Sequence, residues 1–161
     1  MLDSGALLFM SGQFYYRQLD DLAISICAAR EITDDYWREF HEGSHALTKK
    51  IGRSPKVSAI TFVRAHPNAA QRRWSAEFLK TNEVQRISRI AVFSDSVVLR
   101  GAMTAYSWFV QDTTLRPFDC DDVRAGFAWV HELGQFDAEQ ALNVWREGHL
   151  KVGLSRPSLR P

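Results

Sequence analysis

The chain of 161 residues has only two cysteines, Cys27 and Cys120, and they do not form a CxxC pair. Such cysteines predict reduced thiols in a cytoplasmic protein rather than a disulfide framework. An excess of one charge is also missing, because 20 Lys and Arg residues stand against 19 Asp and Glu residues. The near-neutral balance gives no indication of nucleic acid or of an anionic membrane as a partner.

Long apolar runs and glycine-rich loops are missing as well. The short apolar run at residues 6–10 has no basic segment before it and is too short for a signal peptide or a membrane span. Neither GxGxxG nor GxxxxGK[ST] occurs, which excludes the glycine-based dinucleotide and P-loop interpretations. We therefore expect a cytoplasmic protein that needs no cofactor.

The composition that is present is that of an ordinary folded domain, with 45% hydrophobic and 24% charged residues. This length suits one domain with a substantial core. We expect an N-terminal extension over residues 1–12, a single domain over residues 13–150 and a flexible C-terminal tail over residues 151–161. The tail is predicted from its two prolines and its bias toward Ser and Arg.

Between residues 57 and 118 one pattern occurs three times: an apolar, β-branched strand, a capping turn and a helix. Before this region, residues 14–18 and 22–28 predict a hairpin, and Thr33 predicts the start of a helix that Gly52 ends. The sequence therefore predicts an α/β fold with a mixed, mostly parallel sheet of about five strands, flanked by about five helices. The strands of the repeated units are predicted at residues 57–63, 87–93 and 115–118, and the later helices at 68–80, 97–110, 121–133 and 137–150.

The sequence HEGSH at residues 41–45 matches the zinc-peptidase pattern HExxH. On a helix, His41 and His45 lie one turn apart and could share a zinc ion, with Glu42 as general base. However, charged residues flank the motif, the helical periodicity places His45 toward solvent, and nothing selects a third ligand. We therefore favour a solvated helix face over a metal site, which stays the alternative.

Polar residues gather where the predicted strands end, which is where open α/β sheets bind ligands. The candidate residues for a ligand or partner surface there are Arg64, His66, Asn68, Arg72, Ser94, Asp95, Ser96 and Arg100. The arginines could hold a phosphate or a carboxylate. Asn68 and residues 94–96 have an alternative explanation as helix caps, and we favour that explanation over a ligand site. No Ser–His–Asp set can be nominated, so we expect no enzymatic activity.

The helix over residues 97–110 is apolar around most of its circumference, with its polar residues on one narrow stripe. Such a helix is either deeply buried or covered by another molecule. Tyr106, Trp108 and Phe109 therefore join the candidate partner surface, for a protein partner or a second copy of the chain. The alternative is that the last two helices and the N-terminal extension cover this surface within the monomer.

The order of elements and several local sequences resemble the STAS-like (SpoIIAA-like) domain of anti-sigma-factor antagonists, in its small bacterial branch. The sequences that carry this resemblance are PNAAQR at residues 67–72, SDSVVLRGAMTAYSWF at 94–109 and RPF at 116–118. The resemblance covers about residues 14–133. It implies a non-enzymatic module that acts through protein–protein contact and is sometimes switched by a phosphoserine after the third strand. Here that place holds residues 66–69, none of which has a side-chain hydroxyl, so the sequence departs from the family's phosphoserine pattern.

Two functions follow as expectations. The first is a regulatory or scaffold module that binds another protein through its second and third helices. The second is a sensor of a small ligand, such as a phosphate, a nucleotide or a lipid, with Arg64, Arg72 and Arg100 at the binding site.

Overall fold

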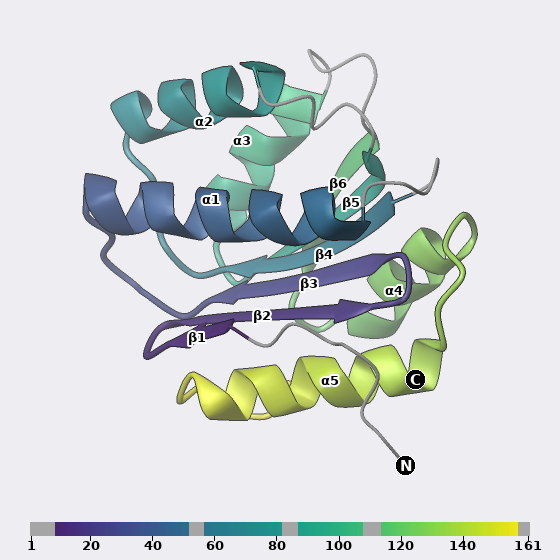
Figure 1. The fold of residues 1–161 in the computed structure, drawn as a ribbon. Coiled ribbons are helices and arrows are strands. Elements are labelled where there is room, and N and C mark those ends of the chain that lie inside the picture. Colours follow the sequence, from purple (N-terminus) through teal and green to yellow (C-terminus); the bar gives the residue numbers. More distant parts are fainter. Residues whose placement is uncertain (1–8, 52–56, 82–86, 108–113, 158–161) are drawn as a thin grey trace.

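The computed structural model describes residues 9–51, 57–81, 87–107 and 114–157 (Figure 1). The strands in these ranges are β1 (Phe9–Ser11), β2 (Phe14–Leu19), β3 (Leu22–Cys27), β4 (Val57–Val63), β5 (Ile87–Ser94) and β6 (Thr114–Asp119). The helices are α1 (Asp34–Ile51), α2 (Ala69–Thr81), α3 (Val97–Ser107), α4 (Val123–His131) and α5 (Ala138–Lys151). No helix in the described ranges combines the length and the apolar character that a bilayer crossing requires.

The strands form one sheet in the order β1-β2-β3-β4-β5-β6. The first three strands pair antiparallel and the last four pair parallel, which confirms the mixed, mostly parallel α/β sheet. The sheet has six strands instead of about five, because Phe9 to Ser11 add an edge strand to β2. The predicted N-terminal extension therefore ends in the sheet. An edge strand of three residues is too short to show a recognisable sequence pattern, because it is held by backbone hydrogen bonds to the neighbouring strand.

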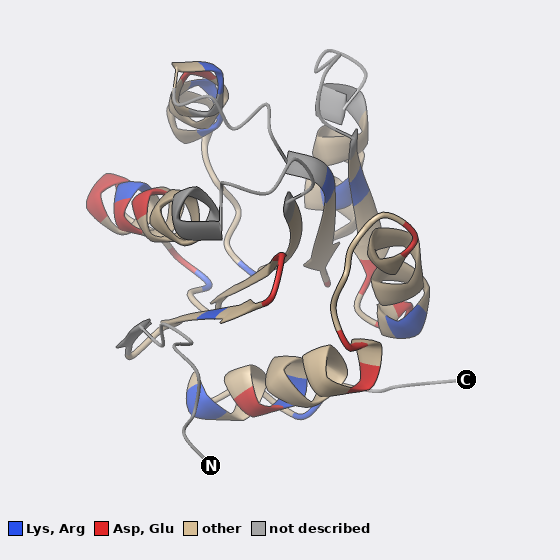
Figure 2. Cartoon of the chain, turned by 45° about the vertical axis from the view of Figure 1, so that its right-hand side comes forward, with Lys and Arg blue, Asp and Glu red and all other residues tan. Residues whose placement is uncertain are grey.

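Helices cover both faces of the sheet, α1, α2 and α3 on one side and α4 and α5 on the other (Figure 1). Strand β3 is consequently buried along its whole length, as expected for a strand covered on both faces. Helices α4 and α5 lie on the face of the sheet opposite α3 and therefore do not cover it. The alternative that these last two helices bury the apolar surface of α3 is wrong for both of them. Positive and negative residues are mixed on the same helices, in keeping with the balanced net charge (Figure 2).

The two faces of the sheet carry side chains of different size, because neighbouring residues in a strand point to opposite faces. Toward α4 and α5, the central strands contribute large, fully buried residues such as Ile24, Ile26 and Ile60. Toward α1, α2 and α3, the same strands contribute small residues, namely Ala23, Ser25, Ala59 and Thr61. The sheet therefore fills the space on the α4–α5 side and leaves it open on the other.

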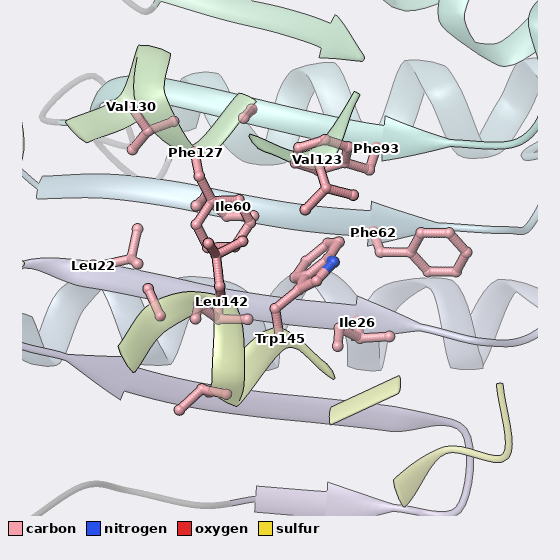
Figure 3. Close-up of a cluster of buried hydrophobic side chains, with 14 of the residues drawn as sticks. Leu22, Ile26, Ile60, Phe62, Phe93, Val123, Phe127, Val130, Leu142 and Trp145 are labelled. Atoms are coloured by element: carbon pink, nitrogen blue, oxygen red, sulfur yellow. The ribbon is translucent and has the colours of Figure 1, made fainter. Parts of the chain in front are cut away.

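The larger core lies between the sheet and the α4–α5 pair (Figure 3). Trp145 of α5 is 1% exposed, and its ring lies 5.2 Å from that of Phe93 and 6.4 Å from that of Phe62. Gly126 brings α4 close to the sheet, since a Cβ at this position would lie 2.2 Å from Phe93 Cζ. These contacts hold α4 and α5 at a short distance from the strands.

The chain stays packed beyond the point where the flexible tail was predicted to begin. Gly153, with φ +75°, turns the chain after α5, and the Leu154 N–H donates to the His149 carbonyl over 2.8 Å. Val152 and Leu154 then pack against the larger core. A positive φ suits glycine and is typical of a helix C-terminus. The turn directs the apolar Leu154 back against the core. The amino-acid composition of residues 151–161 does not indicate this contact.

Candidate functional site

A cavity of about 200 Å³ lies between the sheet and α1, α2 and α3. Its floor consists of the small residues of β3 and β4, and its walls include Trp37 and Phe40 of α1 with Leu99 and Met103 of α3. Helix α2 closes the remaining side and lies farther from the sheet than α1 does (Figures 1 and 2). We call this space the helix-side cavity. The cavity is present because the small residues of β3 and β4 do not fill the space between the sheet and α2.

The polar groups around the helix-side cavity are mostly bonded to one another. Ser25 Oγ lies 2.9 Å from Thr61 Oγ1 across β3 and β4. Ser75 Oγ lies 3.0 Å from His41 Nε2 and accepts from Trp37 Nε1 over 2.7 Å. The cavity therefore presents a largely apolar surface, the usual character of a small-molecule site.

His41 lies among aromatic rings, with ring-centroid distances of 4.7 Å to Trp37, 5.7 Å to Trp74 and 6.0 Å to Phe78. Burial lowers the pKa of His41 from 6.5 to about 4, because the imidazolium would lose its hydration. The side chain is consequently neutral at pH 7. Trp74 and Phe78 of α2 provide part of this enclosure, and the HEGSH pattern in α1 does not indicate it.

His45 is half-buried, whereas the sequence placed it toward solvent. Its ring lies 5.6 Å from that of Phe78, so α2 covers it as well. Both histidines of the HEGSH motif thus line the helix-side cavity. Within the part of the chain that the structure describes, no group of three or more His, Cys, Asp or Glu side chains could hold a metal ion.

The three arginines nominated at the strand ends bond to the protein itself. Arg100 donates to the Ser94 carbonyl over 2.6 Å and pairs with Asp119 at 2.8 Å. Arg72 donates to the Pro67 carbonyl over 2.6 Å. Arg64 lies 3.9 Å from the carboxylate of Asp95. The structure therefore does not bring these guanidinium groups together into one anion site.

The polar residues of the turns make helix-cap bonds. At the start of α2, the Gln71 N–H donates to Asn68 Oδ1 and the Asn68 N–H donates to Gln71 Oε1, both over 2.9 Å. This reciprocal pair is a capping box. At the start of α3, Ser96 Oγ accepts from the Leu99 N–H over 3.1 Å and lies 3.3 Å from His66 Nδ1. The preferred explanation of these residues as caps agrees with this geometry.

The aromatic part of the predicted partner surface lies outside the described residues, because Trp108 and Phe109 and the side chain of Tyr106 are not described. In the described part of α3, Val97 and Val98 are 73% and 79% exposed, while Leu99 is buried. The helix therefore presents two adjacent valines to solvent at its first turn.

The small residues that line the helix-side cavity were visible in the sequence as Ala23, Ser25, Ala59 and Thr61, in alternation with larger residues. This alternation of size is the signal that the sequence reasoning missed. It indicates an underfilled face only once the sheet register places the four residues side by side, with Ala23 opposite Ala59 and Ser25 opposite Thr61.

Comparison with known proteins finds no matching family model and no matching curated protein. Among solved structures, the chain is similar to an uncharacterized protein from the DUF3478 family with a SpoIIAA-like fold, from Shewanella loihica PV-4. The TM-score is 0.48 at 12% sequence identity, and the alignment covers 78% of this chain and 92% of that chain. The fold given for that protein is the one that the sequence resemblance predicted.

Proposed function

We propose that this protein is a non-enzymatic sensor domain that binds a small amphipathic molecule, such as a medium-chain fatty acid or alcohol, in the helix-side cavity. The observation that carries the proposal is the cavity itself, about 200 Å³ in volume and lined mainly by apolar side chains. An apolar cavity of about 150 Å³ is enough to bind benzene. Each methylene group removed from water contributes about 0.8 kcal/mol.

The position of the polar groups favours an amphipathic ligand over a purely apolar one. Arg72 and His45 line the cavity together with its apolar walls, and Arg72 is exposed. A carboxylate or hydroxyl near Arg72 could keep contact with water while the alkyl chain lies over Ala59 and Ala23. The arginine would thus act at one end of an apolar site, rather than as part of a phosphate site at the strand ends.

We expect decanoate and decanol to bind in the helix-side cavity. Replacement of Ala59 by Leu should weaken their binding at least tenfold, which corresponds to a loss of about 1.4 kcal/mol of binding free energy. The added side chain occupies the floor of the cavity. Titration calorimetry measures the affinity, and the tryptophan fluorescence, to which the buried Trp37 in the cavity wall contributes, gives a second readout. The matched control is Ala70→Leu on the exposed side of α2, which should leave affinity unchanged. Equal affinity of Ala59→Leu and the unmodified protein would contradict the proposal.

A second candidate function is protein binding through α3, the role that the resemblance implies. The exposed pair of Val97 and Val98 supports it, because adjacent solvent-facing valines are suited to burial against another protein. If the partner is a second copy of the chain, light scattering will show a dimer, and Val98→Glu will produce a folded monomer. A monomeric unmodified protein would remove self-association as the role of this surface.

A further inference from the structure

A second cavity, of about 300 Å³, lies at the carboxyl ends of β4, β5 and β6. Helix α5 and the segment after it, residues 153–157, line its other side. Phe62, Phe93 and Trp145 form its aromatic part, and His149 lies beside them. None of its lining residues also lines the helix-side cavity, so the two are separate sites. We call it the strand-end cavity. Open α/β sheets bind ligands at this end of their strands.

Trp145 brings a hydrogen-bond donor into this region without a protein acceptor. Its side chain is 1% exposed, and its Nε1–H has no hydrogen-bond partner among the described residues. Figure 3 shows the indole nitrogen directed toward Phe62 and the carboxyl ends of the strands. A buried donor without an acceptor is destabilising, because the N–H has lost its hydrogen bond to water and gained none in the protein. A ligand that offers an acceptor here would supply the missing hydrogen bond.

His149, one helical turn after Trp145, supplies the complementary acceptor. Its Nδ1 lies 2.9 Å from the Trp145 carbonyl oxygen, and because a carbonyl only accepts, Nδ1 carries the proton. Burial lowers the pKa of His149 to about 4, so the ring is neutral at pH 7. Nε2 of a neutral imidazole protonated on Nδ1 has a free lone pair. The two residues thus present one donor and one acceptor.

The charges around the strand-end cavity balance. Two arginines, Arg64 and Arg156, and two aspartates, Asp95 and Asp121, contribute to its lining. Arg64 and Asp95 already lie 3.9 Å apart as an ion pair. This arrangement favours neither an anion nor a cation. The aromatic rings beside the donor and acceptor favour a flat molecule, since such rings stack at about 4.5–7 Å.

We propose that the strand-end cavity binds a small, uncharged, planar molecule that carries a carboxamide or lactam group. The carbonyl of the ligand accepts from Trp145 Nε1, and its N–H donates to His149 Nε2. The ring of the ligand packs against Phe62 and Phe93. This site is additional to the helix-side cavity, and its occupant is chemically different from an alkyl chain.

Three probes of nearly the same size test the proposal: benzamide offers both groups, acetophenone only the carbonyl and aniline only the N–H. We expect benzamide to bind at least tenfold more tightly than either of the others, as measured by calorimetry or ligand-observed NMR. His149→Phe should weaken benzamide and leave acetophenone unchanged. Trp145→Phe should weaken benzamide and acetophenone and leave aniline unchanged. Both substitutions keep an aromatic ring in place.

Ala59→Leu is the matched control, because it alters only the helix-side cavity and should leave benzamide binding intact. Failure of one site can therefore be distinguished from failure of the other. The proposal would be overturned by no binding of benzamide, by equal binding of all three probes, or by unchanged benzamide affinity in a folded His149→Phe or Trp145→Phe variant. If Trp145→Phe does not fold, the His149→Phe result and the probe series decide alone. A crystal soaked with benzamide that shows only water in the cavity would also overturn it.

Discussion

Acidification from pH 6.5 toward pH 4 is expected to lower the free energy of unfolding by about 1.4 kcal/mol per pH unit for each of His41 and His149. Burial lowers the pKa of both side chains from 6.5 to about 4. The unfolded chain therefore takes up protons near pH 6.5, while the folded protein does not until about pH 4. The stabilising contribution is complete above pH 6.5 and is lost as the pH falls through this window.

The physical reason is that both imidazoles are enclosed by aromatic rings. His41 contacts Trp37 at 4.7 Å between ring centroids, and His149 lies 4.6 Å from Trp145 and 4.9 Å from Phe62. An imidazolium in either place would lose its hydration, which is the main cause of the lowered pKa of both side chains. The cost of protonation is consequently a property of the packing around each ring.

Urea unfolding at several pH values between 7 and 5 measures this dependence while most carboxylates stay ionised. His41→Phe and His149→Phe should each remove about half of the slope, and the double substitution should remove most of it. A stability that does not change across this range, or a double variant with the original slope, would show that these histidines titrate normally.

Gly126→Ala is expected to destabilise the protein by about 1–3 kcal/mol, the usual cost of overpacking a core. The new Cβ would lie 2.2 Å from Phe93 Cζ. Phe93 is fully buried, and its ring lies 5.5 Å from that of Phe118 and 5.2 Å from that of Trp145. Because neither neighbour can move freely, α4 must shift away from the sheet.

Gly101→Ala is the matched control for this substitution. Gly101 lies in α3, and a Cβ at this position meets no atom within 4 Å. Alanine should therefore stabilise the helix there by about 0.5–1 kcal/mol. Chemical denaturation of both variants measures the opposite signs. If Gly126→Ala is as stable as Gly101→Ala, the contact between α4 and Phe93 does not constrain the fold.

Local features made much of the fold predictable. The apolar strands and the helices after them are strong periodic signals, and the caps at Thr33, Asn68 and Ser96 mark helix starts through bonds that span three residues. The parallel order of the later strands follows from the helices between them. The edge strand β1 was missed because its stability depends on pairing with β2, rather than on its own three residues.

The candidate sites were far less predictable than the fold. Arg64, Arg72 and Arg100 were nominated together as ligand groups from their types and positions. Each also bonds to a carbonyl or carboxylate of the protein, and Arg72 and Arg64 line two different cavities. His45 was predicted to face solvent because the periodicity of one helix gives no information about a second helix packed against it, here α2. The deciding neighbour comes from a distant segment for His45, through Phe78, and for Arg100, through Asp119, whereas Arg72 bonds to Pro67 only five residues before it.

The sequence by itself determined the alternation of strands and helices, the ends of most helices and the size of each residue on the two faces of the sheet. These properties depend on contacts within a few residues or on backbone geometry. Only the tertiary structure decided where space remains, since a cavity is defined by residues that meet from distant segments. The helix-side cavity needs α2 to stay away from small strand residues, and the strand-end cavity needs α5 to bring Trp145 and His149 to the ends of β4 and β5.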